Sequence, residues 1–159
     1  MNEIWTPERQ AVARAEANSW LGTSHHNRLK IKGVGVDCIQ FVYEVLIVAG
    51  ILERAELGGY ATTVGLHETT HKMKKAFKFC AQVRELAPND PQFGDVVAFK
   101  EGKFSAHTGL IIDGRIFHAL SGGVVTASNY VEWSRHIDCF LRFESTGLIG
   151  DPMTAAQMT

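Results

Sequence analysis

Apolar positions change their spacing along the chain, from helical periods in the first half to short runs after Phe93. The spacing over residues 7–20 predicts a helix that Thr6 caps and Pro7 opens. The core-facing side of this helix is expected to hold small, mostly apolar residues: Val12, Ala15 and Ser19. A loop containing three glycines follows and separates this helix from the next.

A second helix is predicted from Cys38 to Ala49, closed by Gly50. Its body is apolar nearly all round, which predicts burial. A third, amphipathic helix is predicted over residues 63–79. One of its faces is expected to hold Leu66, Thr70, Met73 and Phe77, and another His67, His71, Lys74 and Lys78.

After Phe93 the apolar residues come in short runs bounded by glycine and aspartate, a pattern typical of strands. The runs are GDVVAFK, HTGLIIDG, RIFHAL, GGVVTAS and IDCFLRF. Asp113-Gly114 between two of them predicts a hairpin turn. Helices followed by strands indicate an α+β fold with a C-terminal antiparallel sheet. We expect one domain over residues 1–143 and a loose tail over 144–159.

Composition narrows the class of protein. The 159 residues are 45% hydrophobic and 21% charged, which indicates a single soluble domain with a sizeable core. Lys and Arg number 16 against 17 for Asp and Glu, so no basic excess indicates nucleic-acid binding. The polar opening MNEIWTPERQ is unlike a signal peptide, and three well-separated cysteines fit no disulfide framework. These features predict a protein made in the cytoplasm.

Cys38 stands at the start of the second predicted helix, in the stretch KGVGVDCIQF. Asp37 is a good N-cap residue and Gln40 follows three positions later, which has the form of a capping box. The free N–H groups and the macrodipole of the helix would then favour a Cys38 thiolate. A small buried hydrophobe is the alternative, and local sequence leaves both interpretations open. Cys80 and Cys139 have no such setting and are interpreted as structural.

Two histidines flank the predicted hairpin. If Asp113-Gly114 is a two-residue turn, strand alternation places His107 and His118 on one face, about 7–8 Å apart along the backbone diagonal. Gly109, opposite His118, would leave room for both rings. One imidazole can take a thiol proton while the other holds its tautomer, which is the support that a nucleophilic cysteine needs.

A cysteine at a helix start, a histidine at a strand start and a second histidine at the end of the next strand form an order that resembles the NlpC-type cell-wall peptidases. These are papain-like cysteine hydrolases, and the chain is most similar to their phage-encoded branch. The likeness runs from about Ala11 to Phe143 and is carried by ARAEANSWLGTSHH, KGVGVDC, GDVVAF, HTGLIIDGRIFHAL and the W-x-R-H-I segment. It implies a papain-like fold with the nucleophile helix packed on the sheet. It assigns Cys38 as nucleophile, His107 as base and His118 as the residue that orients it.

The resemblance also implies a substrate and a setting. Members of this family cut amide bonds in peptidoglycan stem peptides through a thioester, without a cofactor. In phages they act with tail-tip proteins at the bacterial cell wall, with no nucleic acid or membrane as partner. Asp37 matches a position that meets the substrate amine. His25 stands where the family usually has a tyrosine over the nucleophile, and Ile39 and Gln40 replace a usual serine and glycine.

A rival motif is the literal H-E-x-x-H at residues 67–71. On a helix it would place His67 and His71 on one face as zinc ligands, with Glu68 as a general base. The neighbouring lysines oppose the binding of a dication. Glu85 is a possible third zinc ligand, but no feature of the sequence singles it out. A zinc metallopeptidase therefore stays an alternative to the cysteine hydrolase, which is expected to hold no metal. A second alternative is a non-catalytic tail or binding protein that keeps the fold.

Overall fold

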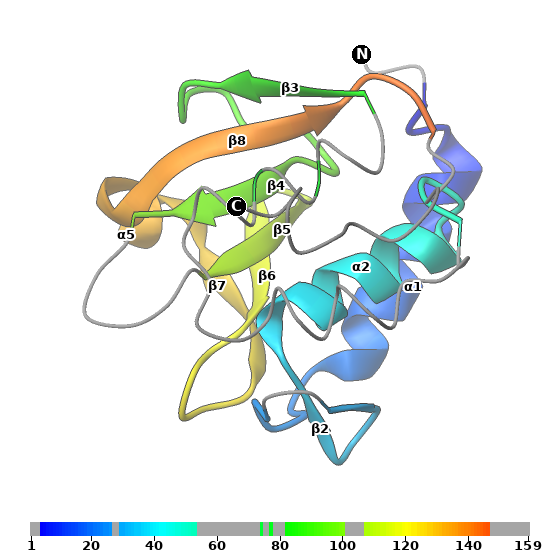
Figure 1. Cartoon of the computed structure of the whole chain (residues 1–159), viewed down its shortest axis with the longest axis vertical. Helices are drawn as coiled ribbons and strands as arrows, with labels where there is room; N and C mark the ends of the chain where they lie inside the picture. Colours follow the sequence, from blue (N-terminus) through cyan, green and yellow to red (C-terminus); the bar gives the residue numbers. More distant parts are fainter. Residues whose placement is uncertain are drawn as a thin grey trace, which may run out of the picture.

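The computed structural model describes residues 4–26, 29–53, 74, 77, 82–100 and 107–146. In this part of the chain, helices come first and an antiparallel sheet follows, so the predicted α+β class is confirmed (Figure 1). No helix in the described ranges has the length and apolar character of a bilayer-spanning segment. Most of the predicted third helix and its HETTH motif lie outside the described residues, where only Lys74 and Phe77 are seen to be helical.

Helix α1 spans Pro7–Trp20, as predicted, and the Thr6 side chain accepts a hydrogen bond from the Arg9 N–H at 3.3 Å. Its buried face was predicted wrongly. The residues that face the core are Ala13, Ala17 and Trp20, whereas Val12 is 42% exposed. The buried set has the i, i+4 and i+7 spacing of a helix stripe and ends in the large Trp20 side chain, whose burial decides which face turns inward.

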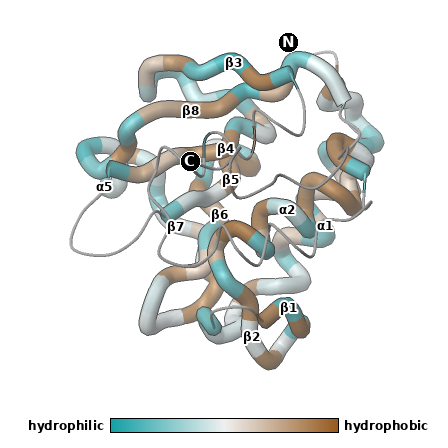
Figure 2. The backbone as a smooth tube through the Cα atoms, viewed as in Figure 1, coloured by the Kyte–Doolittle hydropathy of each residue, from teal (hydrophilic) through white to brown (hydrophobic). Residues whose placement is uncertain are grey.

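Helix α2 spans Cys38–Val48, with Ala49 as its C-cap and Gly50 at φ 81° just beyond. Glycine takes this left-handed conformation without steric cost, so it ends the helix where the sequence predicted. Helix α2 is coloured as apolar along much of its length in Figure 2. It packs against α1 on one side and against the sheet on the other, which explains why it is apolar nearly all round.

Six strands form the main sheet in the order β3-β8-β4-β5-β6-β7. Five of them match the five predicted runs: β4 (Val96–Phe99), β5 (Thr108–Ile112), β6 (Arg115–Ala119), β7 (Val125–Asn129) and β8 (Ile137–Phe143). The sequence analysis missed the edge strand β3 (Val83–Leu86) and a two-stranded hairpin in the glycine-rich loop, β1 (Lys30–Ile31) with β2 (Gly35–Val36). It also missed the single turn of helix α5 (Tyr130–Trp133) and the 3₁₀ turn Ser134–His136 that follows it. All of these elements are short, so periodicity carries little signal for them.

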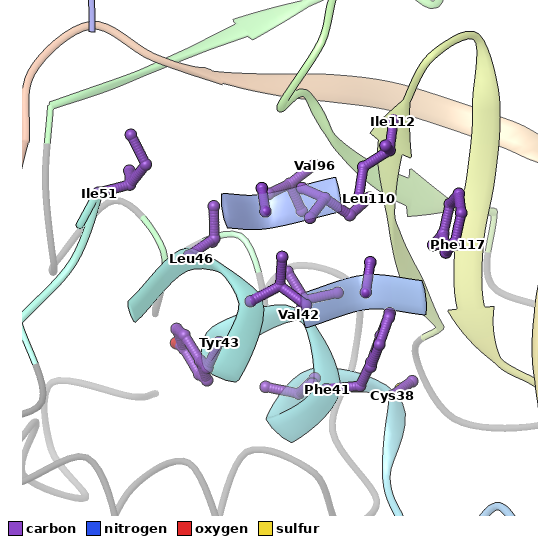
Figure 3. Packing of buried hydrophobic residues seen from close by; sticks show 14 of the residues in the cluster. Cys38, Phe41, Val42, Tyr43, Leu46, Ile51, Val96, Leu110, Ile112 and Phe117 are labelled. Carbon is purple, nitrogen blue, oxygen red and sulfur yellow. The ribbon is translucent and has the colours of Figure 1, made fainter. Parts of the chain in front are cut away.

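The sheet has two apolar faces, and each belongs to a separate cluster. The first cluster lies between the sheet and the two helices, where Val42 and Leu46 of α2 meet Val96 and Leu110 (Figure 3). The second cluster covers the opposite face and contains Val97, Phe99, Ile111, Ile116, Ile137 and Phe140. Because both faces are buried, β4 and β5 are buried at every position rather than at alternate positions. The described chain ends at residue 146, so the predicted tail stays a prediction.

Candidate active site

The N-terminus of α2 is capped by Asp37, as the capping-box pattern predicted. Its Oδ1 accepts the Gln40 N–H at 2.8 Å. The reciprocal half of the box differs, because the Asp37 N–H donates to the Leu29 carbonyl at 3.3 Å. The segment that carries Leu29 runs back past the helix start and supplies this acceptor. Asp37 is 1% exposed, so the cap is a buried carboxylate beside the first helical residue.

Cys38 occupies that first helical position and is 7% exposed. Its sulfur lies within hydrogen-bonding reach of three backbone N–H groups, those of Cys38 itself, Ile39 and Thr108. These donors act as the helix-terminus argument expects and lower the pKa of the thiol. Burial and the neighbouring Asp37 carboxylate act more strongly in the opposite direction and raise that pKa to about 12. The prediction of a resting thiolate is therefore wrong, because the first turn of α2 is buried together with its acid.

The hairpin between β5 and β6 forms as predicted. Asp113 and Gly114 have φ values of 51° and 75°, as the two central residues of a type I′ turn require. The register pairs Ile112 with Arg115, Ile111 with Ile116 and Leu110 with Phe117. Arg14 of α1 binds both carboxylate oxygens of Asp113, at 2.6 and 2.9 Å, and so ties the turn to the first helix.

His107 and His118 come together on one face of this hairpin. The Nε2 atom of His107 lies 2.9 Å from Nδ1 of His118, and the ring centroids are 5.1 Å apart. Gly109 makes the approach possible, since a Cβ there would lie 3.1 Å from the His118 Cβ. Nδ1 is therefore the nitrogen of His107 that does not face His118. The predicted pairing of the two imidazoles is present in the structure.

Both imidazoles are held neutral by their surroundings. His118 is fully buried, stacked on Phe99 at 5.7 Å and met edge-on by Trp133 at 5.0 Å. Burial lowers the pKa of His118 to about 4. Burial, and then the neighbouring His118 and His25, lower the pKa of His107 to about 3. Neutral imidazoles and a neutral thiol suit proton transfer during the reaction rather than a standing ion pair.

The Cys38 thiol lies where α2 packs against β5, the strand that begins directly after His107. The Thr108 N–H that reaches the Cys38 sulfur belongs to the residue directly after His107. Thr108 is fully buried and its hydroxyl donates to the Val97 carbonyl at 2.8 Å, which fixes this start of the strand. The nucleophile candidate thus lies near the residue that follows the base candidate, although about seventy residues separate the two candidates in sequence.

His25 reaches the same place from the loop after α1. Its N–H donates to the Gly123 carbonyl at 2.9 Å, and it forms a bridge with Val36, just before the Asp37 cap. Its side chain is half-buried and close enough for its charge to lower the pKa of His107. The pKa of His25 is itself lowered by burial and by His26. The structure therefore places Asp37 beside Cys38 and His25 near His107.

Sequence reasoning missed one polar neighbour of this group. Ser128 on β7 places its Oγ 2.7 Å from Nε2 of His118. The strand alternation of GGVVTAS offered a weak signal, since Thr126 and Ser128 share a face. The register against His118 depends on the turn at residues 120–124, which the sequence does not specify.

The described residues contain no cluster of three metal-ligating side chains. His67, Glu68 and His71 lie outside the described part, so the zinc motif is not placed. Glu85, the proposed third ligand, forms an ion pair with Lys74 at 2.9 Å and accepts a weak hydrogen bond from the Cys139 thiol at 3.5 Å. Because the Glu85 carboxylate already pairs with the Lys74 ammonium group, it is a poor candidate for a metal ligand.

A helix that begins with cysteine and packs on an antiparallel sheet defines this α+β domain as papain-like. The chain belongs to the NlpC/P60 family, which it matches over residues 17–142. The NlpC/p60 domain of the peptidoglycan hydrolase SagA is similar in structure, with a TM-score of 0.55 and 19% identity over 84% of this chain and 98% of that one. An NLP/P60 family protein from Staphylococcus aureus, described as similar to lipoprotein, has a TM-score of 0.59 and 19% identity over 87% of this chain and 42% of its own. No curated protein matches the sequence.

Proposed function

We propose that this chain is a cysteine hydrolase that cleaves amide bonds in peptidoglycan stem peptides. The observation that carries the proposal is the meeting of the buried Cys38 thiol with the start of β5, where His107 forms a 2.9 Å contact with His118. Membership of the NlpC/P60 family and the fold shared with the SagA peptidoglycan hydrolase domain support the choice of substrate.

The proposed reaction follows from the protonation states. As the Cys38 sulfur attacks the amide carbon, Nδ1 of His107 takes the thiol proton and the carbonyl oxygen becomes an oxyanion. Backbone N–H groups at the start of α2 are suited to stabilise that charge. Collapse of the tetrahedral intermediate breaks the C–N bond, and His107 returns the proton to the leaving amine. The thioester that remains is hydrolysed by a water that His107 deprotonates, which releases a carboxylate and restores the thiol.

Asp37 and His25 are proposed to bind substrate rather than to carry the chemistry. A buried carboxylate beside the nucleophile can pair with a free amine of the stem peptide, which would neutralise the charge that raises the thiol pKa. Substrate binding would thus make Cys38 more acidic at the moment when it must react. His25 offers a ring nitrogen near the reacting carbonyl, in the place that a tyrosine takes in relatives.

The assay is release of soluble fragments from purified peptidoglycan, read by mass spectrometry. Cys38→Ala should abolish release, whereas the matched Cys139→Ala variant and added EDTA should leave it intact. A rapid acid quench should trap the acyl group on Cys38 as a mass adduct. Loss of activity with EDTA or with His71→Ala, together with an active Cys38→Ala variant, would establish the zinc peptidase instead. A wild-type protein that cleaves nothing would favour the binding-protein alternative.

The setting is a separate part of the proposal. From the segments that resemble the phage-encoded branch, we infer that the protein works with phage tail-tip proteins at the bacterial cell wall. Peptide mass spectrometry of purified virions from the phage that encodes the chain should detect it in stoichiometric amounts. Its absence from washed virions, with presence in the host lysate, would refute the association.

A further inference from the structure

Ser128 extends the pair of histidines by one more hydrogen-bonding group. Its hydroxyl lies 2.7 Å from Nε2 of His118, and Nδ1 of the same ring lies 2.9 Å from Nε2 of His107. Both nitrogens of His118 are therefore engaged, one by the base candidate and one by the serine. The three side chains form an unbroken line that ends on β7.

The line has two possible directions, since a neutral imidazole carries one proton and a hydroxyl both donates and accepts. In the first, His107 carries its proton on Nε2 and donates to His118, which donates from its own Nε2 to the Ser128 oxygen. In the second, Ser128 donates to His118, His118 donates to His107, and the proton of His107 sits on Nδ1. Only the first direction leaves Nδ1 of His107 free to take a proton.

The burial of His118 makes its hydrogen bond to Ser128 decisive for the position of the ring proton. His118 is fully buried between Phe99 and Trp133, so among the described residues its Nε2–H has the Ser128 oxygen as its acceptor. A buried N–H without an acceptor costs free energy, and the ring can avoid that cost by moving its proton to Nδ1. That shift would reverse the bond to His107 and place a proton on the nitrogen that must act as base.

We propose that Ser128 is a positioning residue that holds His118 and His107 in their Nε2–H tautomers, so that Nδ1 of His107 is free to accept the Cys38 proton. The assignment rests on the proposed function in one respect, the role of His107 as base. Sheet register supports it: His118 pairs with Thr126 and Ile116 with Ser128, so Ser128 approaches His118 along the diagonal of the same face.

The direct test reads the tautomers by long-range ¹H–¹⁵N correlation of the imidazole rings in the full ¹⁵N-labelled chain at pH 7. The wild type should show both rings as Nε2–H. Ser128→Ala should move a measurable fraction of His118 to the Nδ1–H form, and Ser128→Thr, which keeps the hydroxyl, should restore the wild-type pattern. A wild type with His118 protonated at Nδ1, or tautomers that are unchanged in Ser128→Ala, would overturn the proposal.

A matched control comes from the same strand. Thr126 pairs directly with His118 and shares the face of Ser128, and Thr126→Val removes only its hydroxyl. This variant should leave the tautomers of both rings as in the wild type. If Thr126→Val and Ser128→Ala change the tautomers equally, the effect belongs to strand packing and the proposal fails.

Kinetics separate this proposal from the proposed function. On peptidoglycan fragments, Ser128→Ala should lower kcat about tenfold with an unchanged KM, and Ser128→Thr should recover most of the loss. Unchanged kcat in an active enzyme would overturn the positioning role while the hydrolase assignment stands. If the wild type cleaves nothing, the proposed function falls, and the tautomers of the unmodified protein still decide the direction of the hydrogen bonds.

Discussion

Gly109 sets the distance between the two strands that carry the histidines, and its replacement by alanine tests the geometry of the site. An added Cβ would lie 2.8 Å from the Ile116 Cγ2, 3.1 Å from the His118 Cβ and 3.1 Å from the Phe117 carbonyl oxygen. The Ile116 methyl group can turn aside in part. The other two atoms cannot, because the Phe117 carbonyl and the His118 Cβ move only with the backbone of β6.

The displacement follows from these distances. Ordinary contact begins near 3.4 Å, so β6 must move away by about 0.3 Å at His118. The 2.9 Å bond between His107 and His118 would then lengthen beyond 3.1 Å unless both rings turn. Overpacking of this kind costs about 1–3 kcal/mol in a well-packed core. For a chain of this size, each kcal/mol lowers Tm by about 2–4 °C.

Two measurements check the reasoning. Calorimetry of Gly109→Ala should show a Tm lowered by roughly 5 °C. The peptidoglycan assay should show kcat lowered by about 10- to 100-fold, since small misplacements of catalytic groups are costly. Gly123→Ala is the control for stability, because a Cβ there meets only Leu120 at the ordinary distance of 3.4 Å. A Gly109→Ala protein with wild-type Tm and wild-type kcat would refute the claim that this glycine sets the histidine geometry.

Two further predictions concern protonation. The folded-state pKa values of His107 and His118, about 3 and 4, lie below the unfolded value near 6.5, so the unfolded chain binds more protons in between. The free energy of unfolding should be fully maintained above pH 6.5 and fall as the pH drops toward 4. Urea denaturation of His118→Gln should show a shallower fall of this free energy with pH. Parallel pH dependences for the variant and the wild type would contradict the reasoning. Alkylation of Cys38 by iodoacetamide should be slow at pH 7 and rise to pH 10 without a plateau, because the thiol pKa is raised to about 12. Asp37→Asn keeps an N-cap and removes the carboxylate, so it should speed the reaction, and an alkylation plateau below pH 8 would show that the thiol is acidic after all.

The predictable parts of the molecule are those that local chemistry specifies. Asp37 caps α2 because its side chain reaches an N–H three residues away, and Asp113-Gly114 forms its turn because both residues accept positive φ. Once that turn has two residues, the pairing of His107 with His118 follows from strand geometry alone. These contacts span at most a dozen residues, which is the range over which a sequence pattern can be interpreted without knowing the fold.

Contacts between distant segments were beyond that range. The buried face of α1 depends on what Trp20 packs against, and the pattern through Val12 pointed to the wrong side. Ser128 meets His118 only because the turn between β6 and β7 sets their register.

The sequence by itself determined the α+β order of elements, the helix start that presents Cys38 and the hairpin that pairs the histidines, because each arises from neighbours in the chain. Tertiary structure alone decided the protonation state of the site. The pKa of a thiol depends on how much solvent is excluded around it, and that exclusion is the joint result of helix, sheet and loop. Burial therefore favours a neutral Cys38 thiol over the thiolate that the helix start predicted, and it keeps both imidazoles neutral.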